Sequence, residues 1–335
     1  MNSGLLPRAV FMGIPARLAA AYPTALRSEI SAKVEILGPD IPGDRWEEHA
    51  GEIGRAEVIL STWGMPVLTP DFLAAAPHLR AVFYAAGSVK CFATEEAYER
   101  GVLIFSARLA NAVPVAEYAA AAVVLSLKQF WAYSRSVREQ RVWSRTIPVA
   151  GTYQSTIGLV ALGATGRQTA ERLMHLDCRL LAYDPHVEEG SLRDFGLSLV
   201  SLEEVFRLSD VISIHAPVLP ETCGMIDGRL LAMMKPGATL INTSRGAVIV
   251  ESDLCGILAQ RPDITAVLDV TDPEPPDPGS PLFRLPNVVM TPHISGSMGK
   301  EIGMMGRWMV DELTQFLMDR PLTHHVRREL LAQLA

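Results

Sequence analysis

The chain has 335 residues, of which 49% are hydrophobic and 20% are charged. This length exceeds the usual size of one hydrophobic core, so we expect two domains in a packed globular protein rather than a disordered chain. The 30 basic and 37 acidic residues give a net charge of −7 without any basic block, which makes nucleic acids and anionic membranes poor candidates as partners.

The first third of the chain alternates short apolar runs with helical segments. The spacing of these runs, roughly 20–25 residues, suits βαβ units and predicts a parallel sheet with helices on both faces. Five strands are predicted: Ala9–Met12, Val34–Leu37, Val58–Leu60, Ala81–Tyr84 and Val102–Phe105. The first run is too short for a signal peptide, so we expect a soluble, cytoplasmic protein.

A long apolar helix is predicted next, from about Val113 to Trp131. Its most apolar part, Ala112–Leu127, contains Pro114 and Glu117. It is also shorter than the roughly 18–20 apolar residues that span a bilayer, so we interpret it as a buried helix. The following segment, Ala132–Trp143, is a candidate arm for a homodimer interface.

A second series of apolar runs fills the rest of the chain and predicts a dinucleotide-binding sheet. Six strands are expected: Ile157–Ala161, Leu180–Tyr183, Val211–Ile214, Thr239–Asn242, Ala266–Asp269 and Val288–Met290. A final helical segment, Ile302–Leu317, is expected to pack on the first domain. The domains are therefore predicted as 1–111 plus 301–335 and as 112–300, both doubly wound α/β folds.

The segment 157–166 has the pattern of a strand, a tight turn and a helix start. Gly163 would let a pyrophosphate approach the backbone, and Gly166 would allow close packing of helix and sheet. The helix N-terminus adds free N–H groups and a positive dipole end. Asp184 ends the next predicted strand, where an acid accepts hydrogen bonds from ribose hydroxyls and favours NAD over NADP. The pattern departs from G-x-G-x-x-G at its first position, which is Ala161.

Three further candidate residues each follow a predicted strand: Arg245, Glu274 and His293. Carboxyl ends of parallel strands are where open α/β sheets bind ligands. A guanidinium can hold a carboxylate in a bidentate pair, a histidine can exchange a proton near neutral pH, and a carboxylate can orient that histidine. This set suits hydride transfer between NAD(H) and C2 of a small 2-hydroxy or 2-oxo acid.

Several ordered motifs in residues 112–300 resemble the D-isomer-specific 2-hydroxyacid dehydrogenase family. They are the turn 157–166, the segments Ser209–Pro217 and Met234–Ala238, and the three turns that carry the candidate catalytic residues. The resemblance implies that Arg245 binds the substrate, that His293 is the acid and base, and that Glu274 is its partner. Together, the turn and the resemblance give the following expected cofactor contacts: Gly163, Ala164, Thr165, Gly166, Asp184, Ala216, Pro217, Thr243, Ser244, Arg245, Asp269 and His293.

The resemblance is weaker over residues 1–111, where it implies a flavodoxin-like substrate domain. In such domains the loop after the fourth strand binds the substrate carboxylate through backbone N–H groups, which here points to Gly87 and Ser88. Lys90 stands where the family often has an acid, and either faces solvent or favours a more anionic substrate. Trp63 lies in another loop that either walls the pocket or only packs. The active site is expected where the two domains meet.

Other residue patterns give weaker evidence about function. The four cysteines form no C-x-x-C pair and the histidines form no spaced ligand set, so no metal is expected. His215 is expected to pack or to lie at the edge of the cofactor site. Because the chain ends at residue 335, a long phosphoglycerate dehydrogenase with a regulatory domain is disfavoured, while a short form stays open.

Two alternatives remain at this stage. One is a glyoxylate/hydroxypyruvate reductase that prefers NADPH, against which Asp184 argues. The other is a non-catalytic, dinucleotide-sensing protein of the corepressor kind, which Ala161 and Lys90 would suit but the three candidate catalytic residues would not.

Overall fold

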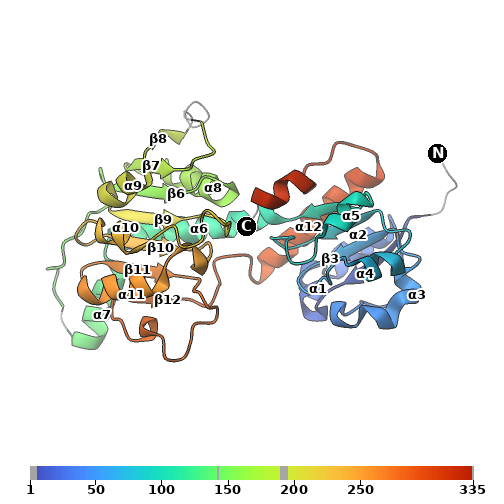
Figure 1. The fold of residues 1–335 in the computed structure, drawn as a ribbon, viewed down its shortest axis with the longest axis horizontal. Coiled ribbons are helices and arrows are strands. Elements are labelled where there is room, and N and C mark those ends of the chain that lie inside the picture. Colours follow the sequence, from blue (N-terminus) through green and yellow to red (C-terminus); the bar gives the residue numbers. More distant parts are fainter. Residues whose placement is uncertain (1–5, 142, 189–194, 334–335) are drawn as a thin grey trace. The chain divides into compact units, whose positions relative to one another are not determined.

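The computed structural model describes residues 6–141, 143–188 and 195–333. The chain divides into two compact units: unit 1 is Met1–Asn111 with Ser297–Ala335, and unit 2 is Ala112–Gly296. The second crossing between them therefore lies after Gly296, a few residues before the position expected from the sequence. Each unit is a parallel sheet with helices on both faces (Figure 1).

Unit 1 contains a five-stranded parallel sheet with strand order β2-β1-β3-β4-β5. This is the flavodoxin-like order, and its topological switch point lies between β1 and β3. The strands are β1 Arg8–Met12, β2 Glu35–Ile36, β3 Val58–Ser61, β4 Ala81–Tyr84 and β5 Leu103–Ser106. The helices are α1 Pro15–Ala21, α2 Thr24–Ser31, α3 Ala50–Ile53, α4 Pro70–Ala75, α5 Glu95–Glu99 and α12 Lys300–Leu317. The predicted strands are confirmed with small shifts at their ends.

The two faces of this sheet are buried by different helices. One face packs on α3, α4 and α5 through side chains such as Ile53 and Phe72. The other packs on α1, α2 and α12, whose Met305, Met309 and Leu313 recur on one side of the helix and are fully buried. The C-terminal helix therefore belongs to unit 1, as its apolar periodicity predicted.

Unit 2 contains a seven-stranded parallel sheet with order β12-β11-β10-β9-β6-β7-β8. Numbered from β6, this is the Rossmann order 3-2-1-4-5-6 with one more strand at the edge. The strands are β6 Thr156–Val160, β7 Arg179–Tyr183, β8 Leu197–Leu199, β9 Val211–Ile214, β10 Thr239–Asn242, β11 Thr265–Leu268 and β12 Val288–Met290. The helices are α7 Phe130–Arg135, α8 Ala164–Leu173, α9 Leu202–Leu208, α10 Gly228–Ala232 and α11 Glu251–Gln260, with α6 Arg108–Leu127 entering from unit 1.

The prediction of six strands in this unit was wrong by one. β8 pairs with β7 through only three residues and forms the edge of the sheet. Its short run has two half-buried leucines around an exposed serine, which is too weak a pattern to stand out in sequence. The six strands that were predicted are present, and Gly158 lies inside β6 as expected.

Helix α6 is long and apolar enough to cross a membrane by length and composition, the one such helix among the described residues. Its residues Ala122, Val123 and Leu127 are buried against strands β6 and β7 and helix α8. Packing against the sheet therefore accounts for the apolar side of this helix. The predicted single helix to Trp131 ends at Leu127, and a left-handed Gln129 separates it from α7.

Candidate active site

The dinucleotide turn joins β6 to α8 and leaves the start of α8 open. Gly163 is the residue before the helix, no side chain caps the first turn, and a Cβ built on Gly163 meets nothing within 4 Å. Gly166 is different, because a Cβ there would lie 2.1 Å from the carbonyl oxygen of Ala161. Open N–H groups and open space at Gly163 fit a pyrophosphate.

Ala161 takes the first position of the turn in a left-handed conformation with φ of 72°. This conformation costs an alanine roughly 1–2 kcal/mol that glycine would not lose. Its N–H donates to the carbonyl of Tyr183, which ties the turn to β7. The turn therefore keeps its shape despite the missing glycine.

Asp184 braces the same turn from the end of β7. Its carboxylate accepts hydrogen bonds from the N–H groups of Leu162 at 2.7 Å and His186 at 2.8 Å. Each carboxylate oxygen has further lone pairs, which leaves acceptor capacity for ribose hydroxyls. The acid expected to select NAD is thus held in place by backbone N–H groups.

Two buried polar atoms near the carboxyl ends of β9 and β10 have no partner within the described chain. They are Oγ1 of Thr243 and Nδ1 of His215. Unpaired buried polar atoms are uncommon and point to a group that completes them. Beside them, Ala216 is buried in the apolar cluster of unit 2, and the Pro217 carbonyl accepts a hydrogen bond from the Thr222 hydroxyl. This edge of unit 2 fits NAD.

His215 also makes the stability of the protein depend on pH. It is buried, its Nε2 pairs with Ser213 Oγ at 3.1 Å, and burial lowers its pKa to about 4. An unfolded histidine has a pKa near 6.5, so between these values the unfolded chain binds more protons and the free energy of unfolding rises with pH. We expect a stability contribution of about 3 kcal/mol to be complete above pH 6.5 and lost as pH falls towards 4.

Urea unfolding between pH 4 and 7.5 measures this effect, with His215→Gln as the comparison. The unfolding free energy of wild type minus that of His215→Gln should increase by up to about 3 kcal/mol as pH rises from 4 to 6.5 and then level off. A difference that stays constant over this range would contradict the assignment, whatever the other histidines contribute.

Arg245 follows β10 and is fixed by its neighbours. Its side chain donates to the carbonyl of Ser244 at 2.7 Å, and the buried Asn242 side chain donates to the Arg245 carbonyl at 2.9 Å. Asn242 also accepts from both N–H and Oγ of Ser244. Burial lowers the pKa of the Arg245 guanidinium, and the charge of Glu274 opposes this. The two segments are neighbours, because a Cβ on Gly246 would lie 2.0 Å from the carbonyl carbon of Thr271.

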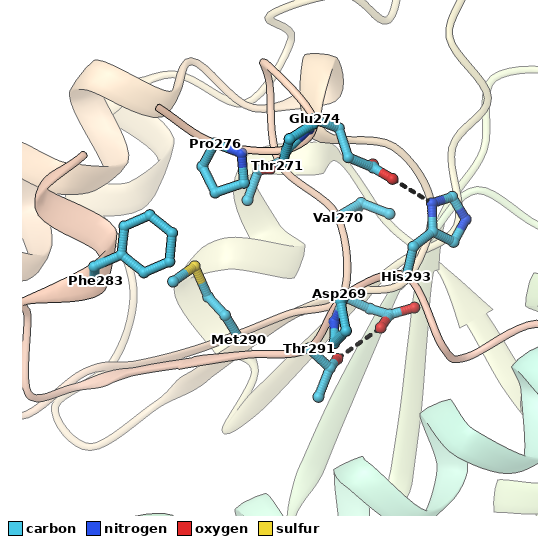
Figure 2. A pocket seen from close by; sticks show the side chains of 11 residues that line it. Asp269, Val270, Thr271, Glu274, Pro276, Phe283, Met290, Thr291 and His293 are labelled. Atoms are coloured by element: carbon cyan, nitrogen blue, oxygen red, sulfur yellow. Dashed lines mark hydrogen bonds and ion pairs between the residues drawn. The ribbon is translucent and has the colours of Figure 1, made fainter. Parts of the chain in front are cut away.

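His293 and Glu274 form a hydrogen-bonded pair. The Nδ1 atom of His293 lies 2.6 Å from Oε1 of Glu274, and both side chains are just under half exposed. Figure 2 shows this nitrogen turned toward Glu274 and the other ring nitrogen turned away from it. A carboxylate on Nδ1 fixes the ring orientation and leaves Nε2 to exchange a proton with another group.

Asp269 holds the loop that carries His293. Its buried carboxylate accepts from Thr291 Oγ1 at 2.6 Å and from the N–H groups of Ile294 and Ser295 at 2.8 Å each. Its carbonyl accepts from the His293 N–H at 2.9 Å. His293 itself is left-handed with φ of 54°, a conformation that a non-glycine residue keeps only when its surroundings impose it.

A cavity of about 530 Å³ adjoins the pair of His293 and Glu274. This pair forms one side of the cavity, and apolar side chains including Phe283 and Met290 lie across from it (Figure 2). Thr291 also lines this cavity and bonds to Tyr118 of α6 at 3.1 Å. Tyr118 thus supports the hydroxyl that contacts Asp269.

The structure brings together the three candidate catalytic residues and Asp269, all within unit 2. It places Gly87 and Ser88 in unit 1, in the loop after β4. Ser106 Oγ donates to the Gly87 carbonyl, while the N–H groups of Gly87 and Ser88 donate to no atom of the described chain. The residues that the sequence did not single out are Asn242 and Thr291. Only their positions in the sequence could have indicated them. Asn242 ends β10 shortly before Arg245, and Thr291 follows β12 shortly before His293.

Part of the chain matches a known family. The model of the D-isomer specific 2-hydroxyacid dehydrogenase NAD binding domain matches residues 120–295. The chain therefore belongs to the D-isomer specific 2-hydroxyacid dehydrogenase family, and unit 2 is an NAD-binding domain of the Rossmann type.

Among similar curated proteins are two named D-3-phosphoglycerate dehydrogenase. The one from Mycobacterium tuberculosis is 36% identical over 229 residues, which are 68% of this chain and 43% of that protein. The one from Archaeoglobus fulgidus is 30% identical over 284 residues, which are 84% of this chain and 53% of that protein. The chain thus spans about half the length of these relatives.

Solved structures agree on the fold. The TT0316 protein from Thermus thermophilus is 25% identical with a TM-score of 0.76, covering 96% of this chain and all of the other. The NAD-complexed D-isomer specific 2-hydroxyacid dehydrogenase from Lactobacillus delbrueckii is 19% identical with a TM-score of 0.79, covering 96% of this chain and 100% of the other. The predicted fold class, family and cofactor are confirmed.

Proposed function

We propose that this protein is an NAD-dependent D-2-hydroxyacid dehydrogenase that interconverts a small 2-oxo acid and its 2-hydroxy acid. The observation that carries this is the 2.6 Å pair of His293 and Glu274, beside which the backbone that follows Arg245 packs closely against Thr271. The pair stands after strands of an NAD-binding sheet. NAD, when bound, supplies or accepts the hydride.

The residues of the chain divide the remaining work. Arg245 would hold the substrate carboxylate and polarise the carbonyl, since a guanidinium presents paired donors and stays charged. The N–H groups of Gly87 and Ser88, which donate to no atom of the described chain, stay candidate ligands of a substrate anion. His293 would give a proton from Nε2 to the oxygen on C2 during reduction and take it back during oxidation. Glu274 would keep the ring oriented and balance its charge.

A substrate screen tests the proposal. Glyoxylate, hydroxypyruvate, pyruvate and bulkier 2-oxo acids are mixed with the protein and NADH or NADPH, and the absorbance of the reduced cofactor is followed. We expect oxidation of NADH by at least one of them and slower oxidation of NADPH, because the Asp184 carboxylate repels a 2′-phosphate. Tight NADH binding without turnover of any 2-oxo acid would favour the dinucleotide-sensing alternative.

The homodimer and the cytoplasmic location stay predictions. The expected arm, Ala132–Trp143, contains the end of α7 and a π-helical turn, Ser136–Gln140, and its residue 142 lies outside the described residues. Trp143 is 91% exposed and lines a surface cavity of about 850 Å³ with other apolar side chains of this segment. An exposed apolar surface of this kind supports an interface between subunits.

A further inference from the structure

The C-terminal segment of unit 1 covers the edge of the unit 1 sheet. Strand β5 is last in the order β2-β1-β3-β4-β5, and residues 321–326 run antiparallel along it. The Ser106 N–H donates to the His324 carbonyl at 3.1 Å, and the Val326 N–H donates to the Ile104 carbonyl at 2.8 Å. We call residues 321–326 the C-terminal strap, because they satisfy backbone groups that an edge strand otherwise leaves unpaired.

A buried carboxylate on α12 also holds the C-terminal strap. Glu312 is only 3% exposed, and its Oε1 accepts hydrogen bonds from the N–H groups of Thr323 at 2.7 Å and His324 at 2.9 Å. Burying a carboxylate is costly unless hydrogen bonds compensate for the lost water. Glu312 therefore keeps these two donors only while the strap is docked.

The C-terminal strap packs on unit 1 through two half-buried histidine rings. The centre of the His324 ring lies 4.9 Å from that of Trp308 on α12, and the centre of the His325 ring lies 5.5 Å from that of Phe105 on β5. The Nδ1 atom of His324 is buried without a hydrogen-bond partner in the described part of the chain. A neutral ring can leave this nitrogen without a proton, whereas a protonated ring carries an N–H on both nitrogens. Protonation would therefore bury an unpaired donor, which is unfavourable.

The surroundings of both rings disfavour their charged form. Burial is the largest cause and lowers the pKa of His324 and the pKa of His325. Two arginines lower these pKa values further and two glutamates oppose them. The charged groups that act on the rings come from the start of α6, from α12 and from the residues after the strap: Arg108, Glu312, Arg327 and Glu329. Both histidines are therefore neutral in the docked strap at neutral pH.

Proton uptake couples these histidines to the docking of the strap. Undocking would expose both rings to water, where a histidine has a pKa of about 6.5. As pH falls below this value, the undocked strap binds more protons than the docked strap. Docking is therefore strongest above pH 6.5 and weakens as pH falls.

We propose that the C-terminal strap is an acid-released cover of β5, which stays docked at neutral pH and leaves the strand edge when His324 and His325 take up protons. Release would also free the Ser106 N–H from the His324 carbonyl. The Ser106 hydroxyl donates to the Gly87 carbonyl at 2.5 Å, so the loop after β4 would lose part of its support. This proposal does not rest on the proposed function.

Hydrogen–deuterium exchange followed by mass spectrometry tests the proposal. Exchange rates of peptides that cover residues 321–326 are measured at pH 7.5 and pH 5 and corrected for the intrinsic effect of pH on exchange. We expect the protection of these amides to fall at least tenfold at pH 5 and to return on neutralisation. Amides of the central strand β3 should keep their protection, which distinguishes release of the strap from unfolding of unit 1.

The double variant His324→Gln with His325→Gln removes both titrating rings and should protect the strap equally at the two pH values. His78→Gln is the matched control, because His78 is an exposed histidine of unit 1 outside the strap, and it should behave like wild type. A wild-type strap that is equally protected at pH 7.5 and pH 5 overturns the proposal, as does a double variant that keeps the full pH dependence.

A second measurement decides the case if the double variant leaves the strap unprotected at both pH values. Nuclear magnetic resonance of wild type with labelled histidine gives the pKa of each ring, and the single variants His324→Gln and His325→Gln assign the two signals. A pKa below about 6.5 for at least one of the two rings supports the proposal, because only then does docking oppose protonation. Values at or above 6.5 for both rings overturn it.

Discussion

Replacing His293 by alanine is expected to reduce kcat for 2-oxo acid reduction about 10²–10⁴-fold, the usual contribution of a positioned general acid. The oxygen on C2 would lose its proton donor, while the dinucleotide turn around Gly163 and the fold of unit 2 would stay intact. NADH should therefore still bind. Steady-state kinetics measure the first effect, and quenching of protein fluorescence by NADH measures the second.

Two comparisons give this prediction its specificity. His78→Ala removes an exposed histidine before β4 in unit 1 and should leave kcat unchanged. Glu274→Gln keeps the shape of the histidine partner but removes its charge, so its kcat should fall between those of wild type and His293→Ala. Full activity of the His293→Ala protein would remove the histidine from the mechanism and leave the proposed function without its acid.

The fold could be predicted largely because parallel strands buried on both faces are continuous apolar runs. Val58–Ser61, Ala81–Tyr84 and Val211–Ile214 are buried at every position, and each was found in sequence. The edge strand Leu197–Leu199 was missed because an edge strand is short and only partly buried. The end of α6 was placed too late, since no proline or glycine marks the left-handed turn at Gln129.

The site was predictable to the extent that chemistry restricts residue type. A guanidinium, an imidazole and a carboxylate after three strands indicated the set Arg245, His293 and Glu274, and the histidine pair is formed in the structure. The role of Asp269 could not be predicted, because a carboxylate after a strand is equally suited to a ligand or to the backbone. Its hydrogen bonds to the His293 loop are contacts between segments more than twenty residues apart.

The surroundings of Lys90, in the loop after β4 of unit 1, also could not be predicted from sequence. Lys90 was ambiguous in sequence because its neighbours in space were unknown. Only the strand order places its loop beside the one that follows β5 and carries Arg108.

Gly166→Ala is expected to destabilise unit 2 and to weaken NADH binding together. The added Cβ would lie 2.1 Å from the Ala161 oxygen and 3.1 Å from its carbonyl carbon. Both are backbone atoms of a turn that is already left-handed, so the helix must move away from the turn. We expect a loss of about 2–3 kcal/mol in unfolding free energy, as for an overpacked core, and at least a tenfold rise in the Kd for NADH, measured by urea unfolding and by fluorescence titration.

Alanine substitutions at two other glycines of unit 2 test the effects on packing and on NADH binding separately. Gly163→Ala meets nothing within 4 Å and has an ordinary φ of −67°, so it should fold like wild type but bind NADH more weakly, because its methyl group would stand where the pyrophosphate approaches. Gly256→Ala also meets nothing, lies exposed in α11, and should be neutral for binding and slightly stabilising. Wild-type stability of Gly166→Ala would show that α8 does not pack against the turn as described, and unchanged NADH binding by Gly163→Ala would place the pyrophosphate elsewhere.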